Sequence, residues 1–173
     1  MPRRQRMTSL VVMGVAGSGK SSLMAALVER LGWPALEGDT LHSPANVSKR
    51  AAGIALTDDD RQPWLEAIAA WIGAREAARE SSIVTCSALR RDYRDLLRRG
   101  HPWVWFVHLV APADVLDARL ERRVGHYMPA SMLASQLATL EPLGPDEPGT
   151  VIEAAAPPLQ LADELIERLR LER

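Results

Sequence analysis

Gly14-Val15-Ala16-Gly17-Ser18-Gly19-Lys20-Ser21 forms a complete G-x-x-x-x-G-K-S phosphate loop. The apolar run Ser9–Met13 precedes it, and residues 21–31 follow with apolar side chains at helical spacing. This strand, loop and helix are the context in which the pattern binds a nucleotide. The glycines let successive backbone N–H groups face the phosphates, and the helix start adds its positive end. A glycine-rich turn without a ligand is the alternative, and the flanking elements argue against it.

The polar groups of this loop have expected roles. Lys20 is expected to neutralise the β- and γ-phosphates as a catalytic residue, and the Ser21 hydroxyl is expected to bind Mg²⁺ directly. Lys20 and Lys49 are the only lysines among 21 basic residues, so the lysine of the loop stands out in an arginine-rich chain. The residues expected to bind the nucleotide here are Gly14, Val15, Ala16, Gly17, Ser18, Gly19, Lys20, Ser21 and Ser22.

Strands and helices alternate along the rest of the chain. Apolar, β-branched runs predict strands at Ser9–Met13, Ala35–Glu37, 82–86, Val104–Val110 and 150–152. Helical patterns cover residues 21–31, 64–78, 93–99, 113–123, 131–140 and 159–171. Strands separated by helices predict an α/β fold, with a parallel sheet of about five strands and helices on both faces. We expect one domain over residues 1–173, a flexible segment at 1–8 and a mobile loop in the proline-rich stretch 142–158.

Charge and composition exclude several classes of function. The net charge of −1 argues against nucleic-acid binding, which needs a strong basic excess. Cys86 is the only cysteine, which leaves no intrachain disulfide and fits a reducing cytoplasm. Basic residues before Leu10 resemble the start of a signal peptide, but the apolar run breaks at Gly14. No apolar stretch approaches the ~20 residues of a membrane span, so we expect a cytoplasmic protein without membrane or nucleic-acid partners.

An acidic segment follows the second predicted strand, Glu37-Gly38-Asp39-Thr40-Leu41-His42. In an open parallel sheet, ligands bind at the carboxyl ends of the strands. Glu37 is expected to face Mg²⁺, through a water molecule, and Asp39 to accept the proton of an attacking hydroxyl as a catalytic base. His42 is expected to contact the acceptor. The alternative is a solvated acidic loop.

Two further segments bring polar groups toward the same edge. Thr57-Asp58-Asp59-Asp60-Arg61-Gln62-Pro63-Trp64 has the acidic residues and the proline of a helix N-terminus. Capping does not explain Arg61, which could hold a substrate carboxylate with two hydrogen bonds; a plain surface arginine is the alternative. Cys86-Ser87-Ala88-Leu89-Arg90-Arg91 ends the third strand, where Ser87 and Arg90 are expected to reach a ligand and Cys86 to be a small core residue.

Two arginines also lie just before and at the start of a predicted lid, which covers about residues 122–130. Arg119 and Arg123 lie one helical turn apart, before Gly125 and His126. They are expected to bind the nucleotide, with Arg123 as a catalytic residue; a basic helix end stabilised by the helix dipole is the alternative. His126 is expected to contact the acceptor. Neither His42 nor His126 has Cys or His partners at ligand spacing, so neither is predicted to bind a metal.

Together these segments resemble the gluconate kinase (gluconokinase) family of P-loop kinases over residues 10–142. Three of these segments are together far more specific to this family than the phosphate loop is. They are Gly38-Asp39-Thr40-Leu41-His42, Asp59-Asp60-Arg61-Gln62-Pro63-Trp64-Leu65 and Cys86-Ser87-Ala88-Leu89. The other matching residues are Asn46, Lys49, Gly53, Leu56, Asp58, Tyr93-Arg94-Asp95-Leu96-Leu97-Arg98, Arg119-Leu120, Arg123, Gly125-His126, Met132-Leu133, Ser135-Gln136 and Leu140-Glu141.

The resemblance implies a P-loop kinase fold and transfer of the ATP γ-phosphate to the 6-hydroxyl of D-gluconate by a cytoplasmic homodimer. The expected acceptor contacts are then Asp39, His42, Arg61, Ser87, Arg90 and His126. Two departures stand out: Lys49-Arg50 replaces the usual Lys-Met, and Glu153-Ala154-Ala155-Ala156-Pro157 replaces an aspartate-containing run near the expected adenine site.

Two other functions compete with this one. A small-metabolite kinase resembling shikimate kinase would also need an acidic pair and an arginine for a carboxylate, whereas a nucleotide kinase would need an acceptor-base site that the sequence does not show. A non-catalytic GTP-dependent switch would need a D-x-x-G segment. Asp146-Glu147-Pro148-Gly149 matches that pattern, but it comes late in the chain, and the sequence has no Asn-Lys-x-Asp motif to bind a guanine base.

Overall fold

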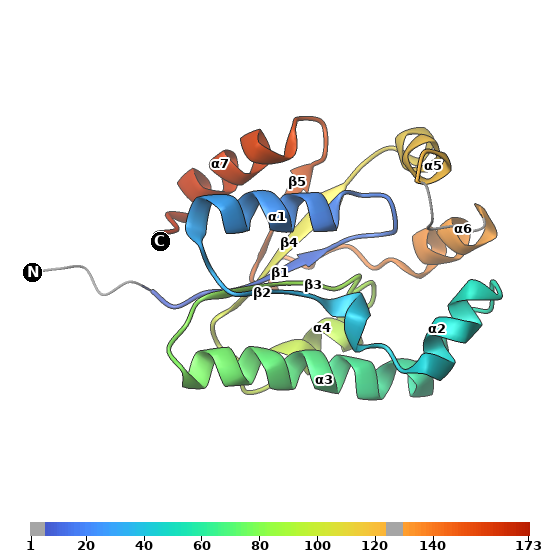
Figure 1. Cartoon of the computed structure of the whole chain (residues 1–173), viewed down its shortest axis with the longest axis horizontal. Coiled ribbons are helices and arrows are strands. Elements are labelled where there is room, and N and C mark those ends of the chain that lie inside the picture. The colour runs from blue at the N-terminus through green and yellow to red at the C-terminus, as the bar shows by residue number, and fades with distance from the viewer. Residues whose placement is uncertain (1–5, 124–129) are drawn as a thin grey trace, which may run out of the picture.

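Five parallel strands form the centre of the structure, a computed structural model that describes residues 6–123 and 130–173 (Figure 1). Their order across the sheet is β2-β3-β1-β4-β5. The strands are β1 Ser9–Met13, β2 Ala35–Glu37, β3 Ser82–Thr85, β4 Val104–Val110 and β5 Gly149–Glu153. The predicted parallel α/β sheet is therefore confirmed.

The central strand β1 is buried along its whole length. Ser9 pairs with Ser82 of β3 on one side and with Val104 of β4 on the other. A strand with neighbours on both edges and helices on both faces has no exposed side, which explains its unbroken apolar sequence. Because β1 leads directly into the phosphate loop, its pairing fixes where that loop begins.

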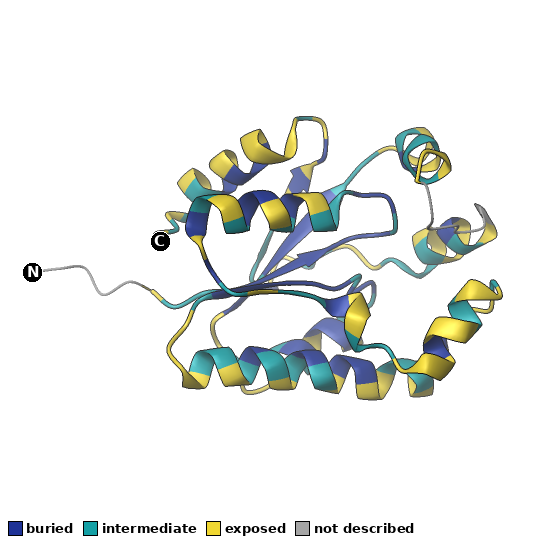
Figure 2. Cartoon of the chain, viewed as in Figure 1, coloured by how far each residue is buried: buried dark blue, intermediate teal, exposed yellow. Residues whose placement is uncertain are grey.

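Helices cover both faces of the sheet (Figure 1). Leu10 and Val12 of β1 pack in the core formed with α1 and α7, whereas Val11 and Met13 pack against α3 and α4, as alternation along a strand requires. Figure 2 shows the buried residues on the sides of these helices that face the sheet. The helices are α1 Lys20–Leu31, α2 Pro44–Ala51, α3 Asp58–Ala77, α4 Arg91–Arg98, α5 Ala113–Glu121, α6 Ala130–Thr139 and α7 Pro158–Leu169.

The region between β2 and α3 differs from the prediction. A 3₁₀ turn at Gly38–Leu41 and the helix α2 were not predicted, and α3 begins at Asp58 rather than at residue 64. The predicted capping by an aspartate is confirmed, because Thr57 and Asp60 form a capping box at the start of α3. Pro63 lies inside the helix rather than in its first turn.

The sequence predicted both a mobile loop in the proline-rich stretch 142–158 and a strand within this stretch at residues 150–152. The stretch contains β5, and Arg94 of α4 holds it through Glu147, with Nε to Oε1 at 2.7 Å and Nη2 to Oε2 at 3.0 Å. Both side chains are fully buried. Burial alone would raise the pKa of Glu147, but the hydrogen bond from Arg94 brings it below its ordinary value. The Asp146-Glu147 pair of the D-x-x-G pattern thus anchors the stretch, with Asp146 paired to Arg91.

The N-terminal segment is held at Thr8. Its N–H donates to Ser81 Oγ at 3.1 Å, and its carbonyl accepts from the Ser82 N–H at 3.0 Å. The flexible segment predicted at 1–8 therefore does not include Thr8, and residues 1–5 lie outside the described part of the chain. Across the described helices, none combines the length and apolar character needed to cross a bilayer.

Candidate active site

Two adjoining cavities lie along the phosphate loop, on the side where the strands end. The larger cavity measures about 360 Å³ and the smaller about 300 Å³. Gly17, Gly19 and Arg123 line both cavities, so the loop forms the boundary between them. Other residues line one cavity and not the other. The larger cavity has Lys20, Asp39 and Arg61 in its wall, and the smaller cavity has Arg119.

The backbone of the phosphate loop depends on its first glycine. Gly14 has a φ of +146°, and a Cβ there would lie 2.7 Å from Leu109 O and 2.8 Å from Ser18 Oγ. The loop can therefore turn sharply away from β1 only without a side chain. Lys20 folds back over this turn, and its Nζ donates to Gly14 O at 3.0 Å and to Val15 O at 3.1 Å. Burial lowers the pKa of Lys20, while the nearby Asp39 opposes this shift.

The first turn of α1 meets the end of β2 through oxygen atoms. Ser21 Oγ donates to Glu37 Oε1 at 2.8 Å, and Thr85 Oγ1 donates to the same oxygen at 2.5 Å. Gly38 makes this possible, because a Cβ there would lie 2.0 Å from Thr85 O. A hydroxyl and a carboxylate are the oxygen ligands that Mg²⁺ prefers, and Mg²⁺ also keeps several waters. The donor set around Ser21 and Glu37 therefore fits this ion.

His42 is stacked inside the larger cavity. Its ring lies 4.1 Å from that of Trp64 at an angle of 18°, and Trp64 Nε1 donates to Gly38 O at 2.8 Å. The His42 side chain is 3% exposed, and its buried Nδ1 has no hydrogen-bond partner among the described residues. Burial, helped by the positive charges of Arg50 and Arg61, lowers its pKa to about 4. His42 is therefore a neutral hydrogen-bonding group at neutral pH.

Arg50 of α2 is a site residue that the sequence argument missed. It lines the larger cavity, and its Nη2 lies 3.4 Å from Asp39 Oδ2. Asp39 also lies near His42, with Oδ1 3.8 Å from Nε2. The departure from Lys-Met at positions 49 and 50 was the signal that could have identified Arg50. The predicted base is thus held between an arginine and a neutral imidazole.

The two arginines predicted to contact the acceptor, Arg61 and Arg90, have different positions. Arg61 and Ser87 line the larger cavity, and Arg61 Nη1 donates to the Tyr93 hydroxyl at 3.1 Å. Tyr93 in turn donates to Asp58 Oδ1 at 2.5 Å. Arg61 is therefore held at the cavity wall by a chain of polar contacts.

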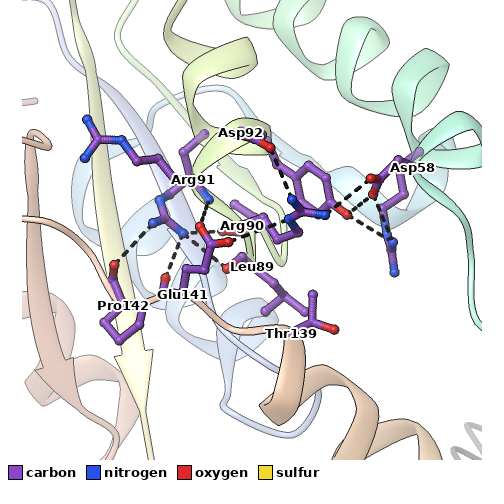
Figure 3. A network of polar contacts seen from close by, with 12 residues as sticks. Asp58, Leu89, Arg90, Arg91, Asp92, Thr139, Glu141 and Pro142 are labelled. Atoms are coloured by element: carbon purple, nitrogen blue, oxygen red, sulfur yellow. Dashed lines mark hydrogen bonds and ion pairs between the residues drawn. The ribbon is translucent and has the colours of Figure 1, made fainter.

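Arg90 lies farther from the cavity, within a network of carboxylates (Figure 3). Its Nη1 lies 3.3 Å from Asp58 Oδ2, its Nη2 3.2 Å from Asp92 Oδ2 and its Nε 3.7 Å from Glu141 Oε1. It lines neither cavity. Because Arg61 lines the larger cavity and Arg90 does not, Arg61 is better placed to meet a substrate anion.

Arg119 joins the phosphate loop to the segment after β5. Its Nη1 donates to Ser18 O at 3.2 Å and to Gly17 O at 3.4 Å, and its Nη2 donates to Ala154 O at 2.8 Å. Ser18, Ser22 and Ala154 line the smaller cavity beside it. The predicted lid falls mostly on residues 124–129, which include His126 and lie outside the described residues.

Gln136 of α6 is a second site residue that was not predicted. Its Oε1 accepts a hydrogen bond of 2.8 Å from the N–H of Ala16 in the phosphate loop. The residue was part of a predicted helix, but nothing in the helical pattern indicated that this face would meet the loop.

The chain is similar to known proteins over nearly its whole length. Residues 10–143 match the protein family described as an AAA domain. The chain is 47% identical over 163 residues to a gluconokinase of Gluconobacter oxydans (strain 621H), covering 94% of this chain and 92% of that protein. An unliganded sugar kinase from Janibacter sp. HTCC2649 superposes with a TM-score of 0.90 at 48% identity, covering 95% of each chain. A gluconokinase from Sinorhizobium meliloti 1021 gives 0.83 at 45% identity, covering 96% of this chain and 95% of that one.

Proposed function

Because the chain belongs to the gluconokinase family, we propose that it transfers the γ-phosphate of ATP to the 6-hydroxyl of D-gluconate, giving 6-phospho-D-gluconate. One observation carries this proposal beyond the family resemblance. The cavity that contains Asp39, His42 and Arg61 adjoins the cavity beside Arg119, and the phosphate loop separates them. An acceptor and a nucleotide could therefore meet across Gly17 and Gly19.

The nucleotide is assigned to the smaller cavity and the loop. The base and ribose would lie between Arg119 and the segment after β5, and the phosphates would follow the N–H groups of the loop toward Lys20. Arg123 borders both cavities, where charge develops on the transferred group. An arginine there would stabilise this charge in the transition state.

Mg²⁺ is assigned to the junction of α1 and β2. Ser21 Oγ would bind it directly, and Glu37 would hold one of its waters. When bound there, Mg²⁺ would neutralise phosphate charge. The protein supplies the orientation, because the Ser21–Glu37 hydrogen bond already brings the two oxygen atoms to 2.8 Å.

The acceptor is assigned to the larger cavity. Asp39 would accept the proton of the 6-hydroxyl, and His42 and Ser87 would hydrogen-bond other hydroxyls as neutral partners. Arg61 would pair with the carboxylate. Arg90 is assigned a supporting position behind Asp58 in place of direct contact. His126 keeps its expected acceptor contact.

The cellular setting follows the family as well. We assign the protein to the cytoplasm as a homodimer, with gluconate and ATP as its small-molecule partners and with neither nucleic acid nor membrane as a partner. The net charge of −1 supports the absence of a nucleic-acid role.

An assay of ADP release over a panel of acceptors tests the activity. With Mg-ATP, the protein should consume gluconate and leave glucose nearly untouched, because glucose lacks the carboxylate that Arg61 would bind. Faster turnover of shikimate or of a nucleoside monophosphate would overturn the assignment. ATP binding without any phosphorylated acceptor would favour a non-catalytic nucleotide-binding protein.

A further inference from the structure

One face of α6 lines the larger cavity. The four residues are spaced by three, one and three positions, which places them on the same side of a helix. α6 and α2 lie near one another beyond the carboxyl ends of the strands (Figure 1), and both contribute to this cavity. The residues of α6 are Met132, Ser135, Gln136 and Thr139.

The two sides of the cavity differ in charge. The side built from the 3₁₀ turn at Gly38–Leu41, α2 and α3 contributes the charged groups Asp39, Arg50 and Arg61. The α6 side contributes only neutral side chains, three of which carry a hydroxyl or an amide. Charged groups suit a carboxylate, and neutral donors and acceptors suit hydroxyl groups.

Gln136 has a fixed orientation on this face. The backbone N–H of Ala16 can only donate, so the side-chain atom 2.8 Å away must be the carbonyl oxygen, which settles which end of the amide is which. The NH₂ group therefore points away from Ala16. Among the described residues, none accepts a hydrogen bond from Gln136 Nε2. Within the described part of the chain, its two N–H groups therefore remain available to a ligand in the cavity that Gln136 lines.

Thr139 has a different capacity. Its hydroxyl donates to Ser135 O within the helix at 2.9 Å. The Thr139 oxygen can then only accept a hydrogen bond from a ligand, whereas Gln136 Nε2 can only donate one. The two side chains, about one helical turn apart, therefore offer opposite hydrogen-bonding roles.

We propose that the α6 face recognises the hydroxyl-bearing chain of the acceptor, with Gln136 Nε2 donating a hydrogen bond to one of its hydroxyls. This inference rests on the proposed function and adds a specificity-determining residue to it. The hydrogen bond between Gln136 and Ala16 gives the proposed contact with the acceptor a second role. A hydroxyl held by Gln136 is held at a fixed place relative to the phosphate loop, and correct placement of reacting groups accelerates the reaction.

The test compares gluconate with four analogues that each lack one hydroxyl, at C2, C3, C4 or C5. In the wild-type protein, loss of the hydroxyl that Gln136 recognises should lower kcat/KM roughly threefold to tenfold, as expected for one neutral hydrogen bond. In Gln136→Met, the penalty for that one analogue should disappear, while the penalties for the other analogues should remain.

Leu137→Gln is the matched control, because Leu137 is the next residue, is 38% exposed and does not line the cavity. It should leave all four penalties unchanged. If Gln136→Met does not fold, Thr139→Val keeps the Ala16 contact and allows the same comparison. Unchanged penalties for every analogue in the variants would overturn the inference. If the wild type does not use gluconate, the proposed function fails by itself, and the deoxy analogues of the sugar acid that it does phosphorylate then test the α6 face.

Discussion

The Ser21 hydroxyl donates a 2.8 Å hydrogen bond to Glu37 Oε1, which ties the first turn of α1 to the end of β2. Lys20, next to Ser21, and Asp39, two residues after Glu37, line the same cavity. One short contact therefore fixes the spacing between the group expected to bind the donor phosphate and the group expected to activate the acceptor. The predictions below separate the role of each group.

Replacing Lys20 with Met should abolish most turnover and leave thermal stability nearly unchanged. The variant loses two hydrogen bonds to loop carbonyls, but it also removes an ammonium group whose burial is unfavourable. Loss of a charge that stabilises the transition state typically costs about 10²–10³ in kcat. Lys49→Met is the matched control: it breaks the 2.8 Å pair with Asp60 and should lower the melting temperature slightly while turnover persists. Activity of Lys20→Met within tenfold of wild type would contradict this role.

Asp39→Asn should lower kcat by roughly 10²–10⁴-fold, the usual effect of losing a general base. The KM for ATP should barely change, because Asp39 lines the acceptor cavity and not the nucleotide cavity. Asp59→Asn, at an exposed position of α3, serves as the control and should keep wild-type kinetics. A rise confined to the KM for gluconate would assign Asp39 to binding, as a loose transition state that needs little base assistance would allow.

Arg61→Ala should weaken gluconate binding by roughly 10–150-fold, which corresponds to the loss of one charged hydrogen bond of about 1.5–3 kcal/mol. A neutral polyol analogue should lose much less, because it has no carboxylate. Arg90→Ala should weaken gluconate less than Arg61→Ala does, because Arg90 lies among Asp58, Asp92 and Glu141 outside the cavity. Equal losses for gluconate and the neutral analogue in Arg61→Ala would point to another carboxylate partner, such as Arg50.

Arg123→Lys should strongly lower kcat with little change in gluconate binding. Arg123 borders both cavities, and a lysine offers a point charge without the planar fork that matches phosphate oxygens. Arg122→Lys changes the adjacent, exposed arginine in the same way and should have no comparable effect. Similar kcat values for the two variants would leave Arg123 as part of a basic helix end.

Acidification should destabilise the protein through His42. Its pKa is about 6.5 in the unfolded chain and about 4 in the folded one, so the unfolded state takes up the proton first. This contribution to stability is complete above about pH 6.5 and declines as the pH falls toward about 4. His42→Phe keeps an aromatic ring against Trp64 and removes the titration. Between pH 7 and pH 5 the melting temperature of this variant should therefore fall less than that of the wild type. An equal fall in melting temperature for the two proteins would contradict the lowered pKa of His42.

The nucleotide half of the site could be predicted from sequence because it depends on neighbouring residues. Ser9–Met13, the glycines and Lys20 are contiguous, and each position of the loop has a local reason. The carboxyl end of β2 could also be placed, because strand order alone brings Glu37 and Asp39 to the ligand-binding edge.

Other parts depend on contacts between distant residues. α2 has little apolar periodicity, and Asn46 Nδ2 holds it by donating to Asp60 O at 2.8 Å. The contact between Ala16 and Gln136 spans 120 residues, so no local pattern predicts it. The stretch 142–158 has the composition of a loop, but Arg94, 53 residues before Glu147, fixes it in place. In this stretch the ion pair between distant residues determines the backbone structure, and the local composition does not reveal it.

The buried pair of Arg94 and Glu147 limits where the protein can be labelled or fused. By composition, the proline-rich connection before β5 looks like a convenient place to insert a reporter peptide. An insertion there would separate two charges that have no access to water, and breaking a buried pair typically costs about 3–5 kcal/mol, a large share of the 5–15 kcal/mol that holds a typical domain together. The turn at Arg99 and Gly100, where both residues are exposed, is the safer position for a tag.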